Sequence, residues 1–597
     1  MSMEALTSRD RRIDLLAYAL ISVMTVFWMV SYQRVPEINE DASCYTGLAV
    51  SLSHLHYNFN YVNHVNYPPG FPAVLLLLSH LYGHQPADSY PVFMMAIAAA
   101  SGLVLLLSYW LIRRHNSRLW ALIYVLLIAS SPFAFEFATR RIGSDIPYCL
   151  FSLAALLAFE RFTAAGPTRV RIWSVVFGAS FLAALTTRTI GVSLFLGLSI
   201  WIAVSWLRSR KPPQGALIVI LLCGLLEQGA WFAWTKANYV RPAPGENTYD
   251  YSDDFRRIDP HRPDLGQAGL WDLARRPVWR LGEETAHVTE FFAANRWVNP
   301  VLYSPLVAVP AFLMLLGLLQ SLRRREVGLC ECYFPLYVII LLVWPYDVGP
   351  RYLFPVSPLC FTYLRRGWRK SLEVSQSSPR TAFLGLAAGS VVLLAMSLYG
   401  WAAHHDAGIQ PRFATAFWAV CAVFTLWLGL RPRLSQPAAS RVIPTPSPFW
   451  RVCGLALIIV MCGLGISIQP ASARSNLRIT EPELLHHPTA EAARWLNQHT
   501  PKDAVVMSFN PWILFAMTGR RVVAFPPTAR PGVILDVARK YRVQYLVVLD
   551  DSWFVPTQEE RLLILQKADP AGLEPAALDK RFRVFRFTRL EQPTAGE

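Results

Sequence analysis

The sequence predicts a polytopic α-helical membrane protein with about thirteen transmembrane helices, followed by a C-terminal extracytoplasmic α/β domain. Of the 597 residues, 53% are hydrophobic and only 16% are charged, which is too apolar for a soluble multidomain protein. Apolar runs long enough to cross about 30 Å of hydrocarbon recur from Ile13 to about Ser467. The rest of the chain has ordinary soluble composition. We therefore predict a membrane domain at 1–468 and a soluble domain at 469–597.

The first apolar run, Ile13 to Tyr32, predicts a retained membrane anchor. Arginines precede it, but no small-x-small cleavage site follows, and the run exceeds a signal-peptide core in length. The expected spans lie near residues 13–32, 92–112, 118–135, 146–163, 172–187, 189–207, 215–235, 301–320, 329–346, 352–364, 381–400, 413–430 and 451–468. The runs at 172–187 and 352–364 are short for a span, so an even count stays open.

Basic residues gather in every second turn between the spans. These clusters include Arg113, Arg114, Arg118, Arg161, Arg208, Arg210, Arg323, Arg324, Arg365 and Arg366. The positive-inside rule then places the N-terminus in the cytoplasm and, for an odd number of spans, the soluble domain outside. The net charge of +16 sits in these clusters and not on one aromatic-rich element, which argues against nucleic acid as a partner.

The soluble tail alternates between helical and strand patterns. Helices are expected near 489–498, 511–517 and 532–541, and strands near 504–508, 521–525 and 544–549. This alternation predicts a small α/β domain with a largely parallel sheet. It has no glycine-rich nucleotide signature, so we expect an accessory role.

Two carboxylates, Glu40 and Asp41, follow the first span directly. Such residues are often a solvated helix boundary, but Tyr45 lies four positions on and a helix-like apolar pattern runs from Leu48 to Leu52. An N-Y-P-P-G-F-P turn that includes Tyr67 comes next. The apolar segment 68–82 is too short to span and predicts a helix along the outer interface.

Three motifs resemble the bacterial GT-C glycosyltransferases, the superfamily of lipid A aminoarabinose transferases and protein O-mannosyltransferases. They are Asp-x-x-x-Tyr with the Tyr-Pro-Pro-Gly-Phe-Pro turn, the stretch Glu136 to Asp145, and G-P-R-Y-L-F-P from Gly349 to Pro355. The resemblance covers about residues 10–365. It implies a GT-C fold and transfer of a hexose or pentose from a polyprenyl-phosphate carrier, on the outer face of the bacterial cytoplasmic membrane. The acceptor that the resemblance implies is a glycolipid, a polymer or a protein.

The resemblance also suggests roles for single residues. Asp41 matches the family's loop aspartate and is the candidate general base, because a carboxylate can take the proton of the attacking hydroxyl. Arg351 is the candidate cation for the leaving phosphate, since it lies on the expected outer side. Glu40 would raise its neighbour's pKa by like-charge repulsion or do nothing.

Each of the further candidate site residues has both a functional and a structural interpretation. Arg188, Arg141 and Lys236 would bind substrate or contact lipid headgroups. Asp145 would hold a metal, orient an arginine or cap a helix. Tyr45, Tyr67 and Tyr352 complete the expected substrate-binding set.

No cofactor is assigned, although a divalent metal ion stays open because some GT-C relatives use one. Cys330 and Cys332 are expected to be inert, and the pairs His404, His405 and His486, His487 are not expected to hold a metal, because adjacent histidines rarely face one ion. Glu227, inside an apolar run, is expected to be neutral and hydrogen-bonded.

Two rival functions remain. A transporter or lipid flippase also needs many helices, but it should show repeated halves, and no internal repeat is found. Alternatively, the membrane part is an anchor and the soluble tail is a binding module.

Overall fold

A computed structural model describes residues 3–36, 39–210, 214–240, 251–258, most of 266–280, 313–323, 327–345, 349–377, 466–479, 487–526, 531–549 and 572–590, with scattered positions elsewhere. Apart from single positions, the expected spans near 381–400, 413–430 and 451–465 lie outside the described residues. His404, His405 and His486 also lie outside them.

Long helices build the membrane part. They are α1 (Met3–Val30), α4 (Tyr90–His115), α7 (Asp145–Ala164), α8 (Pro167–Thr187), α9 (Val192–Ser209) and α10 (Gly215–Ala237). Within the described residues, six helical segments are long and apolar enough to cross a membrane, or seven if one bent pair counts as a single span. These segments match the first seven expected spans, so the polytopic α-helical architecture is confirmed, while the total of thirteen stays a prediction.

The bent pair replaces the single span expected at 118–135. Helix α5 (Arg118–Ser130) and helix α6 (Pro132–Thr139) meet at an angle of 64°. Pro132 has no backbone N–H to continue the first helix, and the Ser131 hydroxyl accepts a hydrogen bond from the Ala134 N–H at 3.2 Å. The chain therefore stops one helix and starts another at this point.

A later group of helices includes Leu313–Arg323, α14 (Leu329–Val343) and α15 (Ser357–Ser377), with the 3₁₀ helix η5 (Pro350–Val356) between the last two. The span expected at 352–364 instead begins as η5 and continues as α15 beyond the predicted end. The helix Leu313–Arg323 crosses α15 where Gly317 faces Gly367, and a Cβ on either glycine would collide with the other helix's backbone. Small residues at such crossings allow two backbones to approach closely.

The segment between α1 and α4 forms a structured unit. It contains α2 (Glu40–Ser53), the short strands β1 (Asn58–Phe59) and β2 (Val62–Asn63), and α3 (Gly70–Leu81). Helix α3 matches the short helix expected at 68–82. The helix expected from Leu48 already begins at Glu40, so Glu40 and Asp41 lie in its first turn and not in a loop before it. The remaining short helices are η1 (Pro86–Asp88), η2 (Thr189–Gly191) and α11 (Tyr251–Arg256).

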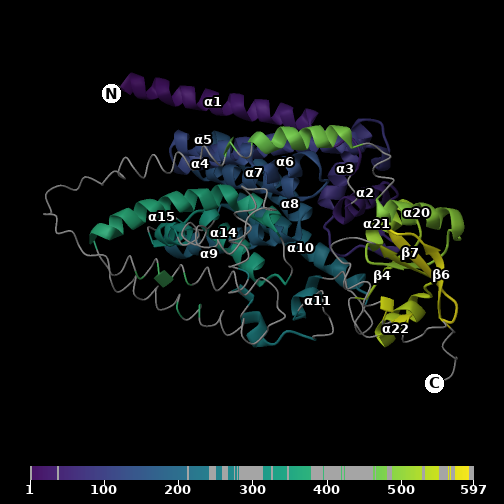
Figure 1. The fold of residues 1–597 in the computed structure, drawn as a ribbon. Coiled ribbons are helices and arrows are strands. Elements are labelled where there is room, and N and C mark those ends of the chain that lie inside the picture. The colour runs from purple at the N-terminus through teal and green to yellow at the C-terminus, as the bar shows by residue number, and fades with distance from the viewer. Residues whose placement is uncertain are drawn as a thin grey trace.

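A five-stranded sheet forms the C-terminal α/β domain, at one end of the molecule in Figure 1. The strand order is β4-β3-β5-β7-β6, for β3 (Val506–Ser508), β4 (Val522–Ala524), β5 (Tyr545–Leu549), β6 (Leu573–Leu578) and β7 (Phe582–Phe587). Helices α20 (Pro488–His499), α21 (Pro511–Thr518) and α22 (Pro531–Tyr541) complete it. All six expected elements are present.

The sheet is mixed, because β3, β4 and β5 are parallel but β7 and β6 are antiparallel. Strands β6 and β7 were not expected from the sequence. The proposed boundary at 468/469 lies within a helical stretch, 466–478. From this stretch the Asn476 side-chain amide donates to the Ser31 carbonyl at 2.9 Å, and Gln469 donates to the Ala129 carbonyl at 2.8 Å. The first residues of the tail therefore pack on the membrane part.

Replacing Gly367 by leucine should destabilise the protein, because the added side chain would force the helix Leu313–Arg323 away from α15. Overpacking of this kind costs about 1–3 kcal/mol. Thermal unfolding of the detergent-purified protein measures the effect. Gly229→Leu on α10 is the matched control, since a Cβ there meets no atom within 4 Å. Equal melting temperatures for the two variants would contradict the close crossing.

Candidate functional site

Asp41 lies in the first turn of α2, where the chain leaves the first membrane helix. Its backbone N–H donates to the Asn39 side-chain oxygen at 2.9 Å, and the Ala42 N–H donates to the same atom at 3.4 Å. This cap and the positive end of the helix dipole both favour carboxylates at Glu40 and Asp41. The local sequence therefore fixes where the two acids stand.

Both carboxylate oxygens of Asp41 have a partner. The Tyr67 hydroxyl donates to Oδ1 at 2.5 Å, and Arg351 Nη1 donates to Oδ2 at 2.7 Å. Arg351 comes from η5, far along the chain. The ion pair is accessible from solvent, since the side chains of Arg351 and Asp41 are 32% and 29% exposed. Part of the Arg351 side chain is therefore left uncovered by the rest of the protein.

A second ion pair lies beside the first. Arg188, at the junction of α8 and η2, pairs with Asp145 at the start of α7, and both side chains are nearly buried. The guanidinium groups of Arg188 and Arg351 lie 4.6 Å and 5.1 Å from the centroid of the Tyr352 ring. One aromatic ring thus contacts two cations, and each cation has its own aspartate.

Two further tyrosines fix this arrangement. The Tyr45 hydroxyl and Ser144 Oγ are 2.8 Å apart, which ties α2 to the start of α7. The Tyr45 and Tyr67 rings stack with centroids 4.6 Å apart. The Tyr337 hydroxyl donates to the Tyr352 carbonyl at 2.7 Å and so holds the backbone beside Arg351. Aromatic packing and hydrogen bonds therefore orient the charged groups.

The two neighbouring carboxyls have opposite pKa shifts. Burial acts to raise the pKa of Asp41, but the charge of Arg351 and hydrogen bonds from Tyr67 and Arg351 outweigh burial and hold it below its ordinary value. Burial and the nearby Asp41 charge raise the pKa of Glu40 to about 7. Among the described residues, Glu40 makes no hydrogen bond through its carboxyl. Asp41 is therefore ionised at neutral pH, whereas Glu40 is close to its titration point.

The structure brings most of the expected site residues together. Asp41, Glu40, Asp145, Arg351, Arg188, Tyr45, Tyr67 and Tyr352 form one group. Asp145 pairs with Arg188, and the Ser144 side chain makes no capping hydrogen bond.

The other candidates have local partners. Arg141 pairs with Glu136 at 2.7 Å, and the Lys236 ammonium lies 5.8 Å from the Tyr239 ring centroid. Glu227 accepts a hydrogen bond from Gln228 at 2.6 Å, in agreement with a hydrogen-bonded group.

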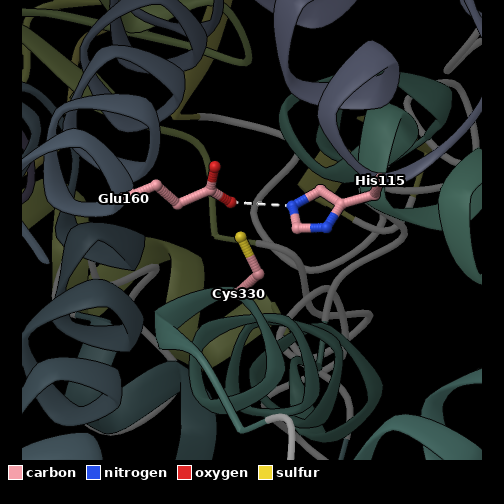
Figure 2. Close-up of side chains that lie close together, drawn as sticks. All are labelled: His115, Glu160 and Cys330. Atoms are coloured by element: carbon pink, nitrogen blue, oxygen red, sulfur yellow. Dashed lines mark hydrogen bonds and ion pairs between the residues drawn. The ribbon is translucent and has the colours of Figure 1, made fainter. Parts of the chain in front are cut away.

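A separate polar cluster lies near the opposite end of α7. Figure 2 shows His115, Glu160 and Cys330, whose ligand atoms lie within 4.8 Å of one another, which makes them the only metal-like group in the described part of the chain. Their contacts favour a hydrogen-bond network, however. Arg366 lies 3.2 Å from His115 Nδ1 and can only donate, so the ring proton sits on Nε2 and faces Glu160 at 2.7 Å.

A metal on His115 Nε2 would move the ring proton to Nδ1, directly against the Arg366 guanidinium. Arg114 also pairs with Glu160 at 2.7 Å, and Arg366 with Glu331 at 3.1 Å. The cluster therefore joins α4, α7, α14 and α15 through ion pairs. These ion pairs occupy Glu160 and Glu331 without Cys330.

One residue of the site region was missed entirely. Trp512, from α21 of the soluble domain, lies 5.8 Å from the Tyr67 ring, centroid to centroid. The sequence offered only a weak signal, a tryptophan directly after the proline that starts a helix. Its proximity to Asp41 depends on how the two domains dock, which a local pattern does not encode.

Comparisons with known proteins found matches among solved structures. No family model and no curated protein matches the sequence. Two solved structures of ArnT from Cupriavidus metallidurans, one bound to undecaprenyl phosphate and one in the apo state, align with it. Each alignment has 16% sequence identity and a TM-score of 0.47, and covers 96% of this chain and 98% of the ArnT chain.

Asp145→Asn should destabilise the protein, because it leaves the nearly buried Arg188 without a counter-charge. Breaking a buried pair on one side costs about 3–5 kcal/mol. Thermal unfolding in detergent measures this loss. Arg188→Met combined with Asp145→Leu should recover most of it, since no unpaired charge remains. A double variant as unstable as Asp145→Asn would refute this account.

Glu40→Gln should change how stability depends on pH. The folded-state pKa of Glu40 is raised from 4.5 to about 7, so ionising it destabilises the fold progressively as pH rises through that window. Glutamine cannot ionise, so the variant should gain stability relative to the parent between pH 5 and pH 8, on the order of 1 kcal/mol. Melting temperatures at both pH values test this. Glu574→Gln, an exposed change on β6, is the control, and a constant difference across pH for Glu40→Gln would argue against a buried acid.

Proposed function

We propose that this chain is a membrane glycosyltransferase that moves a sugar from a polyprenyl-phosphate donor to an acceptor hydroxyl. The observation that carries the proposal is the arrangement of Arg351 and Arg188 on one Tyr352 ring, with the Asp41 carboxylate bound to Arg351. This places an anion-binding group and a proton acceptor side by side. Both are needed when a phosphate leaves as a hydroxyl attacks.

Arg351 is the better candidate for the donor phosphate. Its side chain is 32% exposed, against 13% for Arg188, and charge-assisted bonds from arginine to phosphate oxygens are strong. Arg188 stays paired with Asp145, and its guanidinium also contacts the Tyr352 ring. The two ion pairs are lined by aromatic side chains, those of Tyr45, Tyr67 and Tyr352. Two further cations, Arg141 and Lys236, would bind lipid headgroups or substrate.

Donor binding would also change the chemistry of Asp41. In the present structure Arg351 lowers the pKa of Asp41, which makes the carboxylate a weak base. When the donor phosphate takes over Arg351, Asp41 loses its main counter-charge and its pKa rises. The base becomes stronger at the moment the donor is in place. The exchange also leaves Asp41 Oδ2 available to the acceptor hydroxyl.

The proposed reaction is a single displacement at the anomeric carbon. The acceptor oxygen bonds to that carbon and its proton passes to Asp41. The bond from the anomeric carbon to the phosphate oxygen breaks, and the polyprenyl phosphate leaves with the electron pair. Arg351 stabilises the negative charge that develops on this leaving group. The sugar is a hexose or pentose, and the acceptor is a glycolipid, polymer or protein.

The side of the membrane on which the charged residues lie supports a reaction at the outer face. The charged group lies between α1 and α4 and at the start of α7, away from the arginine-rich turns that contain Arg113, Arg114 and Arg366. By the positive-inside rule those turns are cytoplasmic. We therefore place the reaction on the outer face of a bacterial cytoplasmic membrane, with the soluble domain on the same side.

Asp41→Asn should lower sugar transfer about 10²–10⁴-fold, because asparagine cannot accept the hydroxyl proton. Transfer is measured with radiolabelled polyprenyl-phosphate sugars in membranes that hold each variant at equal abundance. Asp88→Asn is the matched control, since this exposed aspartate belongs to the same outer segment. If Asp41→Asn transfers as well as the parent, Asp41 is not the base. If the parent transfers nothing from any polyprenyl donor, the function itself is wrong.

A further inference from the structure

The first outer segment reaches the soluble domain through a hairpin. Strands β1 and β2 pair antiparallel, and the tip residues Asn60 and Tyr61 have φ values of 54° and 63°, the left-handed conformation of a tight hairpin turn. The hairpin lies against α2, because a Cβ on Gly47 would collide with the Phe59 ring. The segment that carries Asp41 therefore also carries a protruding, well-defined tip.

The hairpin tip closes the edge of the soluble domain's sheet. Strand β4 is at one edge, and the Asn60 side chain meets the backbone of Val522 there. The Val522 N–H donates to Asn60 Oδ1 at 2.9 Å, and Asn60 Nδ2 donates to the Val522 carbonyl at 2.5 Å. A primary amide thus pairs with this edge residue as a neighbouring strand would. The Tyr61 hydroxyl adds a hydrogen bond to the Gly519 carbonyl at 2.8 Å.

Aromatic packing continues this contact toward the charged site. The rings of Phe59 and Phe515 have centroids 4.8 Å apart, edge to face. Trp512, only 9% exposed, packs in one apolar cluster with Cys44 and Leu48 of α2. Figure 1 shows α21 beside α2. The soluble domain therefore touches the helix that begins with Asp41.

Trp512 also contacts the tyrosine bound to Asp41. Its ring lies 5.8 Å from Tyr67 and 5.9 Å from His64, centroid to centroid. Burial lowers the pKa of His64 to about 3, so the imidazole is neutral and packs as an aromatic ring. Tyr67 is thus held between Tyr45 on one side and the pair His64 and Trp512 on another.

We propose that the soluble domain is a working part of the catalytic site, with Trp512 as a positioning residue that holds Tyr67 on Asp41. The proposal rests on the proposed function. It assigns the C-terminal domain a task, which is to keep the Tyr67 hydroxyl hydrogen-bonded to Oδ1 while Arg351 engages the donor phosphate. Asn60 and Tyr61 fasten the domain in place. Release of the domain would weaken the hydrogen bond from Tyr67 to Asp41, and so change the pKa and the orientation of the Asp41 carboxylate.

Hydrogen exchange tests the docking without any activity measurement. Asn60→Gly keeps the left-handed backbone but removes the amide, so the Val522 N–H loses its acceptor. In the full-length detergent-purified protein, peptides that cover β4 and residues 57–67 should exchange at least several-fold faster. Trp512→Ala should do the same for residues 57–67. Trp495→Ala, on α20 of the same domain and stacked on His499, should leave residues 57–67 unchanged.

Transfer kinetics test the positioning role. Without Tyr67's hydrogen bond the pKa of Asp41 rises, so Tyr67→Phe and Trp512→Ala should each move the acid limb of the pH–rate profile to higher pH. They should also lower kcat several-fold, because the Asp41 carboxylate is no longer held in its reacting orientation. The double variant should be no worse than the single ones, because both remove the same contact. Trp512→Phe keeps an aromatic ring and should restore most of kcat, while Trp495→Ala should match the parent.

The outcomes separate the two proposals. Faster exchange at residues 57–67 with an unchanged acid limb in Trp512→Ala would overturn the positioning role, as would effects of Trp512→Ala and Tyr67→Phe that simply add. Unchanged exchange in both Asn60→Gly and Trp512→Ala would overturn the docking. A parent protein that docks normally but transfers no sugar would instead defeat the proposed function and, with it, the catalytic task assigned to Trp512.

Discussion

The ion pair between Asp41 and Arg351 joins residues 310 positions apart in the chain. It holds the segment after the first membrane helix against the 3₁₀ helix that precedes α15. Around it lie the second pair, Asp145 and Arg188, and the shared ring of Tyr352. The two ion pairs together are formally neutral, which lowers the cost of placing these four side chains near a membrane. In the proposed reaction, the donor phosphate therefore competes with Asp41 for Arg351, so that donor binding requires this ion pair to rearrange.

Strong periodic patterns in the sequence predicted much of this architecture. Long apolar runs located the first seven spans, and the alternation after residue 488 located six elements of the soluble domain. Arg351 was singled out because a cation on the expected outer side breaks the positive-inside pattern, and the structure pairs it with Asp41. Such inferences succeed because solvent preference is a local property of a residue and its near neighbours.

Other features could not be predicted in this way. Strands β6 and β7 have exposed and charged positions, such as Glu574 and Arg586, that obscure a strand pattern. The bend at Ser131 and Pro132 lies inside an apolar run that reads as continuous. The contact between Trp512 and Tyr67 joins two domains, and the partner exchange proposed for Arg351 depends on a ligand. Each of these depends on tertiary geometry, which spacing along the chain does not report.

The hydrogen bonds between Asn60 and Val522 also bear on how the soluble domain behaves alone. An unpaired edge strand invites pairing with other chains and is a common route to aggregation. Here a single side-chain amide from the membrane part occupies the backbone groups of Val522 on β4. A fragment produced without the hairpin would carry that edge bare, together with the apolar side chains of Trp512 and Phe515 that the hairpin covers. The hairpin of the membrane part thus covers surfaces of the C-terminal domain that would otherwise favour aggregation. We therefore expect the C-terminal domain to be less soluble as an isolated fragment than within the whole chain.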